Sequence, residues 1–299
     1  MSDVIRLDVM KTYKLFVGGK FPRSESGRVY EVSDSKGQWL ANAPLGTRKD
    51  TRDAVLAARA AVKGWAGTTA YNRGQVLYRI AEMLQGRREQ FAAEVAAAEG
   101  IGAKKAATLV DQAIDRWVWY AGWTDKVAQI AGGANPVAGP YFNLSVPEPT
   151  GVVGIVAPQA GYGHSFLGLV SVIAPVIATG NTAVVAVAAD APLPALSLGE
   201  VLATSDLPGG VVNLLSGRTA DIAPTLASHQ DVNALDLAGA IAHEGPGAAT
   251  VLEASAADTL KRVLWPAVDP AAQDWTVAPG TERLLSFVET KTVWHPMGQ

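Results

Sequence analysis

The glycines between residues 161 and 168 are the first candidates for chemistry. Gly161, Gly163 and Gly168 stand between an apolar run and an apolar helical pattern. A dinucleotide-binding loop has such a setting, because its glycines let the backbone and a helix N-terminus hold a pyrophosphate. The third glycine is misplaced for the usual G-x-G-x-x-G spacing. We therefore interpret the segment as a glycine-rich turn.

Ser165 is a candidate hydroxyl nucleophile, since residues 163–167 resemble the first part of a nucleophile elbow between a strand and a helix. Leu167 stands where the closing glycine of that motif belongs, and no partner Asp and His can be assigned. We predict that Ser165 instead caps a helix that begins at Phe166.

Cysteine and histidine add no further site. The chain contains no cysteine, which excludes disulfides, zinc–thiolate sites and a thiol nucleophile within these residues. The histidines stand singly without metal-ligand spacing, so we expect structural or solvent-exposed roles and no metal. They are His164, His229, His243 and His295.

Composition excludes several classes of partner. A formal net charge of -3 gives no basic field for nucleic acid, and we assign the basic pairs at 87–88 and 104–105 to solvated helix faces. Residues 1–10 lack the apolar core of a secretory signal, and no apolar run is long enough to span a membrane. We expect a cytoplasmic protein that binds neither nucleic acid nor membrane.

The N-terminal part reads as a hairpin followed by helices. A short hairpin is predicted at 15–21, turning at Gly18 and Gly19. Apolar residues at helical spacing predict helices at 49–65, 71–98 and 104–127, and Asp50 suits the N-terminal end of the first. Trp117 and Trp123 fit core positions. A strand is predicted at 141–146, before a Pro-Glu-Pro turn.

From Gly151 onward, short apolar runs alternate with helical patterns, which predicts βαβ units and a right-handed, doubly wound parallel sheet of the α/β class. The predicted strands are 151–157, 182–188, 211–215, 234–237 and 262–268, and the predicted helices lie near 166–178, 194–204, 220–228 and 242–254. A polar connection after Pro266 leads to a short helix at 282–287 and a terminal strand at 290–294.

Eight collinear stretches share one further resemblance. They are 15–20 (LFVGGK), 54–65 (AVLAARAAVKGW), 120–126 (YAGWTDK), 148–156 (EPTGVVGIV), 180–182 (GNT), 207–213 (LPGGVVN), 260–263 (LKRV) and 287–293 (FVETKTV). Together they resemble the aldehyde dehydrogenase superfamily. In this resemblance, the nucleotide-binding part ends near Val268 and the terminal strand follows almost directly. The domain that in this family carries the nucleophilic cysteine has no counterpart between them.

The resemblance also shows which catalytic groups are replaced. The family's Pro-Trp-Asn segment, whose amide holds the oxyanion, falls on Pro158-Gln159-Ala160, and Ala160 offers no donor. The general-base glutamate follows the LKRV stretch by three positions and falls on Pro266, which cannot accept a proton. We therefore predict no catalytic residue in this chain.

The cofactor contacts that the resemblance implies are degenerate in the same way. The lysine and glutamate that hold the ribose fall on Ala186 and Ala189. The turn that keeps Gly239 has lost its hydroxyl residues. Few polar residues stand near Pro158 and Gly217, which the resemblance assigns to the same site. After Gly217, Thr219 and Ala223 replace glycines of the family. We expect no cofactor, with NAD as the one that the family would allow.

The terminal strand and the strand before the Pro-Glu-Pro turn build the family's oligomerisation element, which the resemblance implies here too. Strand addition of this kind supplies main-chain hydrogen bonds. The expected interface residues are Tyr141, Leu144, Val146, Thr290, Thr292, Val293 and Trp294. The face left by the missing domain should also be apolar enough to need a cover.

These observations predict a doubly wound, Rossmann-like α/β fold with an N-terminal helical region and a β oligomerisation arm. Its parts are the hairpin and helices (1–135), an oligomerisation strand (136–150), the Rossmann-like domain (151–268) and a connection with the C-terminal arm (269–299). The leading hypothesis is an inactive subunit that assembles with itself or a full-length aldehyde dehydrogenase. The alternatives are an NAD-dependent component whose missing groups come from a partner, and a decaying product without a role.

Overall fold

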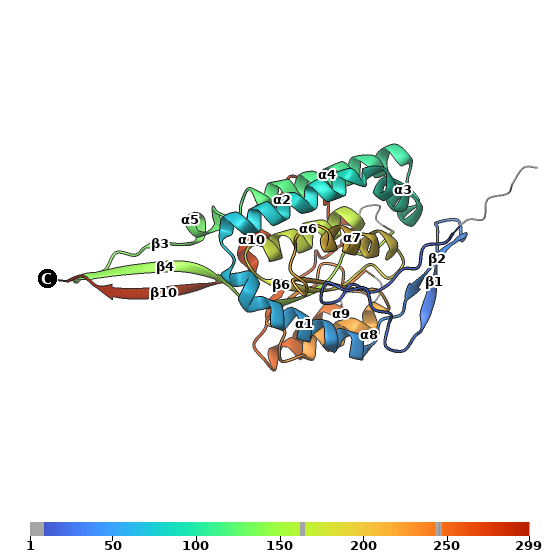
Figure 1. The fold of residues 1–299 in the computed structure, drawn as a ribbon. Coiled ribbons are helices and arrows are strands. Elements are labelled where there is room, and N and C mark those ends of the chain that lie inside the picture. Colours follow the sequence, from blue (N-terminus) through green and yellow to red (C-terminus); the bar gives the residue numbers. More distant parts are fainter. Residues whose placement is uncertain (1–8, 162–164, 243–244, 246, 299) are drawn as a thin grey trace, which may run out of the picture.

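A parallel sheet of five strands lies at the centre of the computed structural model, in the order β7-β6-β5-β8-β9 (Figure 1). The structure describes residues 9–161, 165–242, 245 and 247–298. The strands are β5 (Val152–Val156), β6 (Thr182–Ala186), β7 (Val212–Leu215), β8 (Ala234–Asp236) and β9 (Arg262–Leu264). The order runs outward from β5 in both directions, which confirms the predicted doubly wound sheet.

Helices cover both faces of this sheet, which explains why β5 and β6 are apolar and buried throughout. One layer contains α2 (Ala70–Gly86), α4 (Ala103–Ala121), α6 (Ser165–Ala178) and α7 (Leu193–Ala203) (Figure 1). The other contains α1 (Arg48–Gly67), α8 (Thr219–Ser228) and α9 (Gly247–Ala257).

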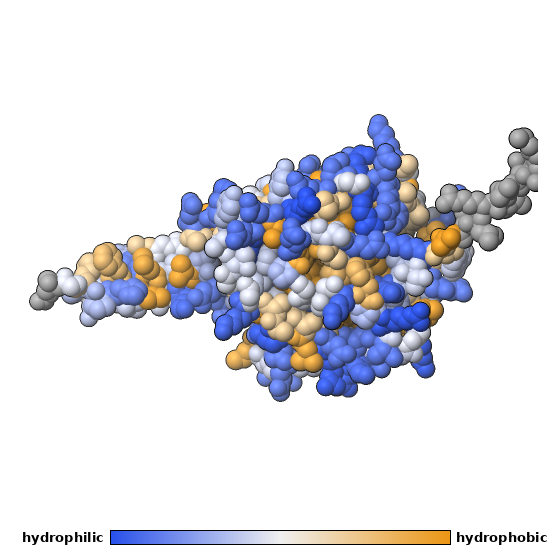
Figure 2. All heavy atoms as spheres, in the orientation of Figure 1, coloured by the Kyte–Doolittle hydropathy of each residue, from blue (hydrophilic) through white to orange (hydrophobic). Residues whose placement is uncertain are grey.

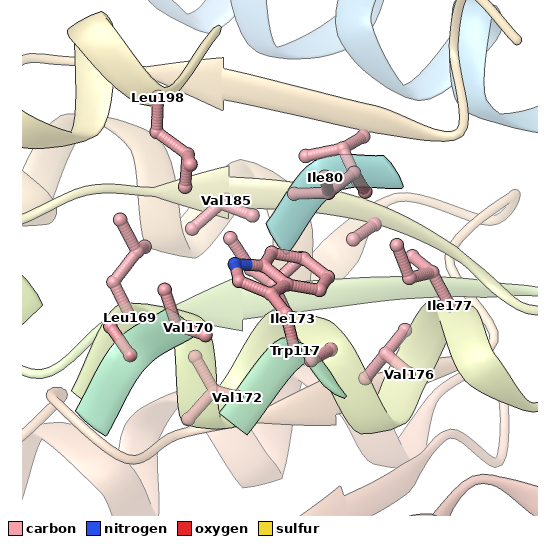
Figure 3. Packing of buried hydrophobic residues seen from close by; sticks show 14 of the residues in the cluster. Ile80, Trp117, Leu169, Val170, Val172, Ile173, Val176, Ile177, Val185 and Leu198 are labelled. Carbon is pink, nitrogen blue, oxygen red and sulfur yellow. The ribbon is translucent and has the colours of Figure 1, made fainter. Parts of the chain in front are cut away.

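The main core lies between the sheet and the first layer. Trp117 of α4 is fully buried and packs among Ile173 of α6 and its aliphatic neighbours (Figure 3). Trp123 is only partly buried and packs against the edge of this cluster. The predicted core role of Trp117 is therefore confirmed.

Two predicted helices are divided in the structure. The helix expected at 71–98 is broken at Arg87 into α2 and α3 (Arg88–Glu99), because Arg87 leaves helical geometry and pairs with Glu200 of α7 at 2.5 Å. The helix expected at 104–127 ends at Ala121, and α5 (Val127–Ala131) follows separately. The apolar spacing continues across both breaks, so it could not reveal them.

The predicted turn at Gly18 and Gly19 is confirmed. Val17 and Lys20 exchange two main-chain hydrogen bonds of 3.0 Å, and the Leu15 N–H donates to the Pro22 carbonyl at 3.1 Å. Phe16 also pairs with Leu214 at the edge of the main sheet. A second hairpin follows, formed by β1 (Val29–Ser33) and β2 (Trp39–Pro44), which was not predicted. At the other end of this region, Thr47 and Asp50 form a capping box that starts α1, which confirms the position of Asp50.

A long two-stranded ribbon projects from the body of the molecule, and we call it the arm (Figure 1). It consists of β4 (Tyr141–Pro149) and β10 (Val288–Pro296), paired antiparallel along their full lengths, with β3 (Gly133–Ala134) beside β4. The short helix α10 (Glu282–Ser286) precedes β10. Across the described ranges, no helix is long and apolar enough to cross a membrane.

Candidate functional site

The positions that the sequence singled out fall at the carboxyl ends of the parallel strands. Pro158 and Ala160 follow β5, Ala189 follows β6, and Gly239 follows β8. Ala186 is the last residue of β6, Gly217 follows β7, and Pro266 follows β9. Ligands of doubly wound folds bind at this edge of the sheet. The topology thus brings the predicted positions to one edge.

Gln159 occupies the space between the ends of β5 and β6. Its side chain is only 2% exposed. The side-chain Nε2 donates to the Ala157 carbonyl at 2.6 Å, and Oε1 accepts the Ala189 N–H at 3.0 Å. Both polar atoms of the side-chain amide therefore hydrogen-bond to the two strand ends, and the amide is not free to hold an oxyanion.

Tyr30 of the unpredicted hairpin closes the same edge from outside. Its hydroxyl donates to the Ala189 carbonyl at 3.0 Å. Burial raises the pKa of Tyr30, so the hydroxyl stays protonated and keeps this bond at neutral pH. Both main-chain groups of Ala189 are thus satisfied by protein side chains. No sequence signal linked a tyrosine in this hairpin to residue 189.

A small hollow lies among the described residues at this edge. Residues at the ends of β5 and β6 and the starts of α6 and α7 line a hollow of about 10 Å³. A site for a small molecule usually has about 300–1,000 Å³. Alanines and prolines form much of this lining; its members are Ala157, Pro158, Ser165, Phe166, Leu169, Ala188, Ala191, Pro194 and Ala195. This hollow, formed by described residues alone, is far smaller than such a site.

The start of α6 is occupied by a carboxylate. The described part of α6 starts at Ser165, and the residues before it lie outside the described ranges, so the capping role of Ser165 stays a prediction. Its N–H donates to Oε1 of Glu99 at 2.7 Å. A phosphate at this helix N-terminus would meet the negative charge of Glu99. Gly163 and His164 of the glycine turn lie outside the described residues, as does His243.

Gly239 serves the packing of the sheet. A Cβ at this position would stand 1.9 Å from the Ala157 carbonyl oxygen. Its N–H donates to the Val156 carbonyl at 2.9 Å. Gly217 has a φ of +144°, which L side chains rarely adopt, and a Cβ there would stand tightly at 3.0 Å from the Gly46 nitrogen. Close contacts within the chain therefore account for both glycines.

Asp236 is a buried carboxylate that the sequence analysis missed. It ends β8, is fully buried, and pairs with Arg283 of α10. Burial raises its pKa, and Arg283 and the Ala238 N–H oppose that shift. A carboxylate held in this way fixes α10 to the sheet. Beside it in the sheet, Pro266 lies two residues beyond the end of β9 and supplies no titrating group.

Histidines supply no metal centre in the part of the chain that the structure describes. His229 accepts the Asp231 N–H at 3.1 Å through Nδ1, and His295 lies exposed on the arm. Within the described ranges, no group of three or more His, Asp or Glu residues could hold a metal ion.

The predicted interface residues divide between the two faces of the arm. In the antiparallel register, Leu144 lies opposite Val293, and Val146 opposite Lys291. The face they share also carries Phe142 and forms an apolar stripe. The other face carries Tyr141, Thr290, Thr292 and Trp294, and the Tyr141 and Trp294 rings meet edge to face at 5.8 Å.

Comparison with known proteins places this geometry in a family. Residues 21–265 match the model described as the aldehyde dehydrogenase family. Cytosolic 10-formyltetrahydrofolate dehydrogenase of Mus musculus is 32% identical over 244 residues, which are 79% of this chain and 26% of that protein. Retinal dehydrogenase 2 of Gallus gallus is 31% identical over 271 residues, 88% of this chain and 49% of that protein.

Solved structures agree with this result. A putative aldehyde dehydrogenase from Burkholderia cenocepacia matches with a TM-score of 0.77 and 29% identity, over 84% of this chain and 51% of that one. The NAD+ complex of an aldehyde dehydrogenase from Bacillus cereus matches with a TM-score of 0.76 and 26% identity, over 85% and 50% respectively. The chain thus spans about half or less of the length of these relatives.

Proposed function

Since the chain belongs to the aldehyde dehydrogenase family and has no cysteine among its 299 residues, we propose that it is a non-catalytic subunit of an assembly. It assembles with itself or with a full-length aldehyde dehydrogenase and acts as a structural or regulatory partner. The first relatives are cytosolic by name, and we place this assembly in the cytoplasm.

The arm is the observation that carries this proposal. Each face of a two-stranded ribbon is open to solvent unless something covers it, and such ribbons are marginal alone. The apolar stripe of Phe142, Leu144, Val146 and Val293 lies on the arm, and Figure 2 shows orange, apolar side chains there. The outer edge of β10 offers nine residues of main chain for strand addition.

On the opposite face of the arm, several polar groups are paired within the chain, beside the exposed rings of Tyr141 and Trp294. Asn135 donates from Nδ2 to Asn143 at 2.6 Å and to Ser145 at 2.7 Å. The hydroxyls of Ser145 and Thr292 lie 3.1 Å apart and share a hydrogen bond. Polar groups paired in this way gain little from a partner.

Further exposed apolar residues lie on α9 and on either side of β9. Leu260 is 93% exposed and Val268 is 97% exposed, and Trp265 and Val251 are also exposed. Exposed large apolar residues gathered in one region mark contact surfaces more often than free ones. Cover by a second subunit would remove them from water.

Capture experiments test the assembly. The tagged chain is co-expressed with a full-length aldehyde dehydrogenase from the same organism, and co-purification and the aldehyde oxidation rate are measured. We expect capture of the relative and no oxidation by the chain alone. Oxidation of an aldehyde with NAD by the purified chain would overturn the proposal.

The alternative, an NAD-dependent component completed by a partner, is separated by cofactor titration. The small hollow at the strand ends and the carboxylate at the start of α6 disfavour binding. Calorimetric titration with NAD should show no binding to the chain alone. In the captured assembly, it should show no more binding than the full-length relative accounts for. Saturable micromolar binding to the isolated chain would favour the alternative.

A further inference from the structure

A cavity of about 450 Å³ lies between the helical layer and the connection that follows β9. Arg116 and Tyr120 of α4 and Ser171 of α6 line it from the body, and residues 272–280 close it from outside. The volume is within the range of small-molecule sites. It shares no lining residue with the small hollow at the ends of β5 and β6.

Arg116 is a buried cation without a carboxylate partner. Its side chain is 7% exposed, and Nη2 donates to the carbonyls of Trp275 at 2.8 Å and Val277 at 3.0 Å. Within the described ranges, no carboxylate forms an ion pair with it. Burial lowers the pKa of Arg116, because the charge is taken from water. A bound anion would offset this cost.

Tyr120 supplies a second donor on the same face of α4, one helical turn from Arg116. Its side chain is 1% exposed, yet its hydroxyl makes no hydrogen bond to any residue that the structure describes. Burial raises its pKa to about 12, so the hydroxyl is protonated at neutral pH. Because Tyr120 lines the cavity, this hydroxyl is free to donate to an acceptor placed there.

The remaining lining limits the charge and shape of a ligand. Asp274 and Glu282 are exposed members of the lining and disfavour a multiply charged anion. Arg283 also lines the cavity, but its charge is shared with Asp236 and its guanidinium lies 5.0 Å from the Trp275 ring. The apolar part of the lining is Trp275, Val277, Ala278 and Pro279.

We propose that this cavity binds a small monocarboxylate with an apolar body, whose carboxylate accepts hydrogen bonds from Arg116 and Tyr120. The planar guanidinium suits a carboxylate, and the apolar body lies against the connection. This site is separate from the arm and does not depend on the assembly proposed above.

Benzoate is the probe, and benzamide, its uncharged counterpart of the same shape, is the control. Calorimetric titration of the full chain should give saturable binding of benzoate and at least about tenfold weaker binding of benzamide. Equal affinities for the two compounds, or no benzoate binding at millimolar concentration, would overturn the proposal.

Two substitutions assign the contacts. Arg116→Gln retains a donor for the carbonyls of the connection and should weaken benzoate binding by about tenfold or more, whereas Arg116→Lys should restore part of it. Tyr120→Phe removes only the unpaired hydroxyl and should weaken binding about fivefold with the fold intact. Should Arg116→Gln not fold, the Tyr120→Phe result decides; unchanged affinity in a folded variant contradicts the site.

Discussion

The side-chain amide of Gln159 joins the Ala157 carbonyl to the Ala189 N–H, and so bridges the ends of two neighbouring strands. Polar groups at this edge of a doubly wound sheet usually face a ligand. Here a side chain from the protein satisfies them. The residues at this edge are therefore part of the core, and we expect their substitution to lower the stability of the protein.

Replacement of Gln159 should therefore reduce stability. Gln159→Ala leaves the Ala189 N–H and the Ala157 carbonyl without their partner, which should lower the free energy of unfolding by about 1–3 kcal/mol. Denaturant unfolding followed by circular dichroism measures the change. Gln85→Ala, on the exposed surface of α2, is the control and should have almost no effect. Equal stabilities of the two variants would refute the structural role of Gln159.

Gly239 should tolerate no side chain. The Cβ of Gly239→Ala would overlap the Ala157 carbonyl oxygen, so β5 or β8 must shift, at a cost of about 3 kcal/mol or more. Gly64→Ala is a matched change in α1, where no atom lies within 4 Å, and should stabilise the protein by about 0.5–1 kcal/mol. Thermal unfolding of both variants gives the comparison. A mild effect at Gly239 would mean that a ligand, and not packing, selects glycine there.

Acid should destabilise the fold through His229. Burial lowers the pKa of His229 below 6.5, and Asp231 opposes the shift only in part. Below pH 6.5 the unfolded chain therefore binds a proton that the folded chain does not, so stability falls as the pH falls through this window. Protonation of Nδ1 also removes the acceptor for the Asp231 N–H.

His229→Asn keeps an acceptor for that N–H and should flatten the dependence of stability on pH between 5 and 7. Urea unfolding at several pH values measures it. His295→Asn, on the exposed arm, should retain the wild-type slope. The same slope in all three proteins would exclude His229 as the titrating group.

The apolar stripe of the arm should control association. Leu144→Lys places a charge on the stripe and should abolish assembly, while leaving the stability of the monomer within about 0.5 kcal/mol, because the site is exposed. Thr290→Lys changes the opposite face of the same arm and should leave assembly nearly intact. Gel filtration with light scattering reads both. If both variants still assembled, the apolar stripe would not be the contact surface.

The sequence predicted the sheet well, because short apolar runs that alternate with helical patterns, as β5 and β6 do, are typical of strands buried on both faces. It also predicted the edge to which Ala160, Ala189 and Gly239 come, since the ends of parallel strands share an edge. It did not predict the β1–β2 hairpin, whose strands mix polar and apolar residues without clear alternation.

Side-chain partners across long separations were out of reach of the sequence. Tyr30 meets Ala189, and Arg116 meets the carbonyl of Trp275. The connection after β9 was expected to be polar, yet Trp275 is buried in the main core. Such contacts depend on how loops fold back on the body, and no local spacing records them.

Sedimentation equilibrium of the purified chain, alone and mixed with a full-length aldehyde dehydrogenase, is the most direct measurement. We expect masses that are multiples of the 31.1 kDa chain, or a mixed species that contains both proteins. A stable 31.1 kDa monomer in both samples would contradict a subunit built for assembly.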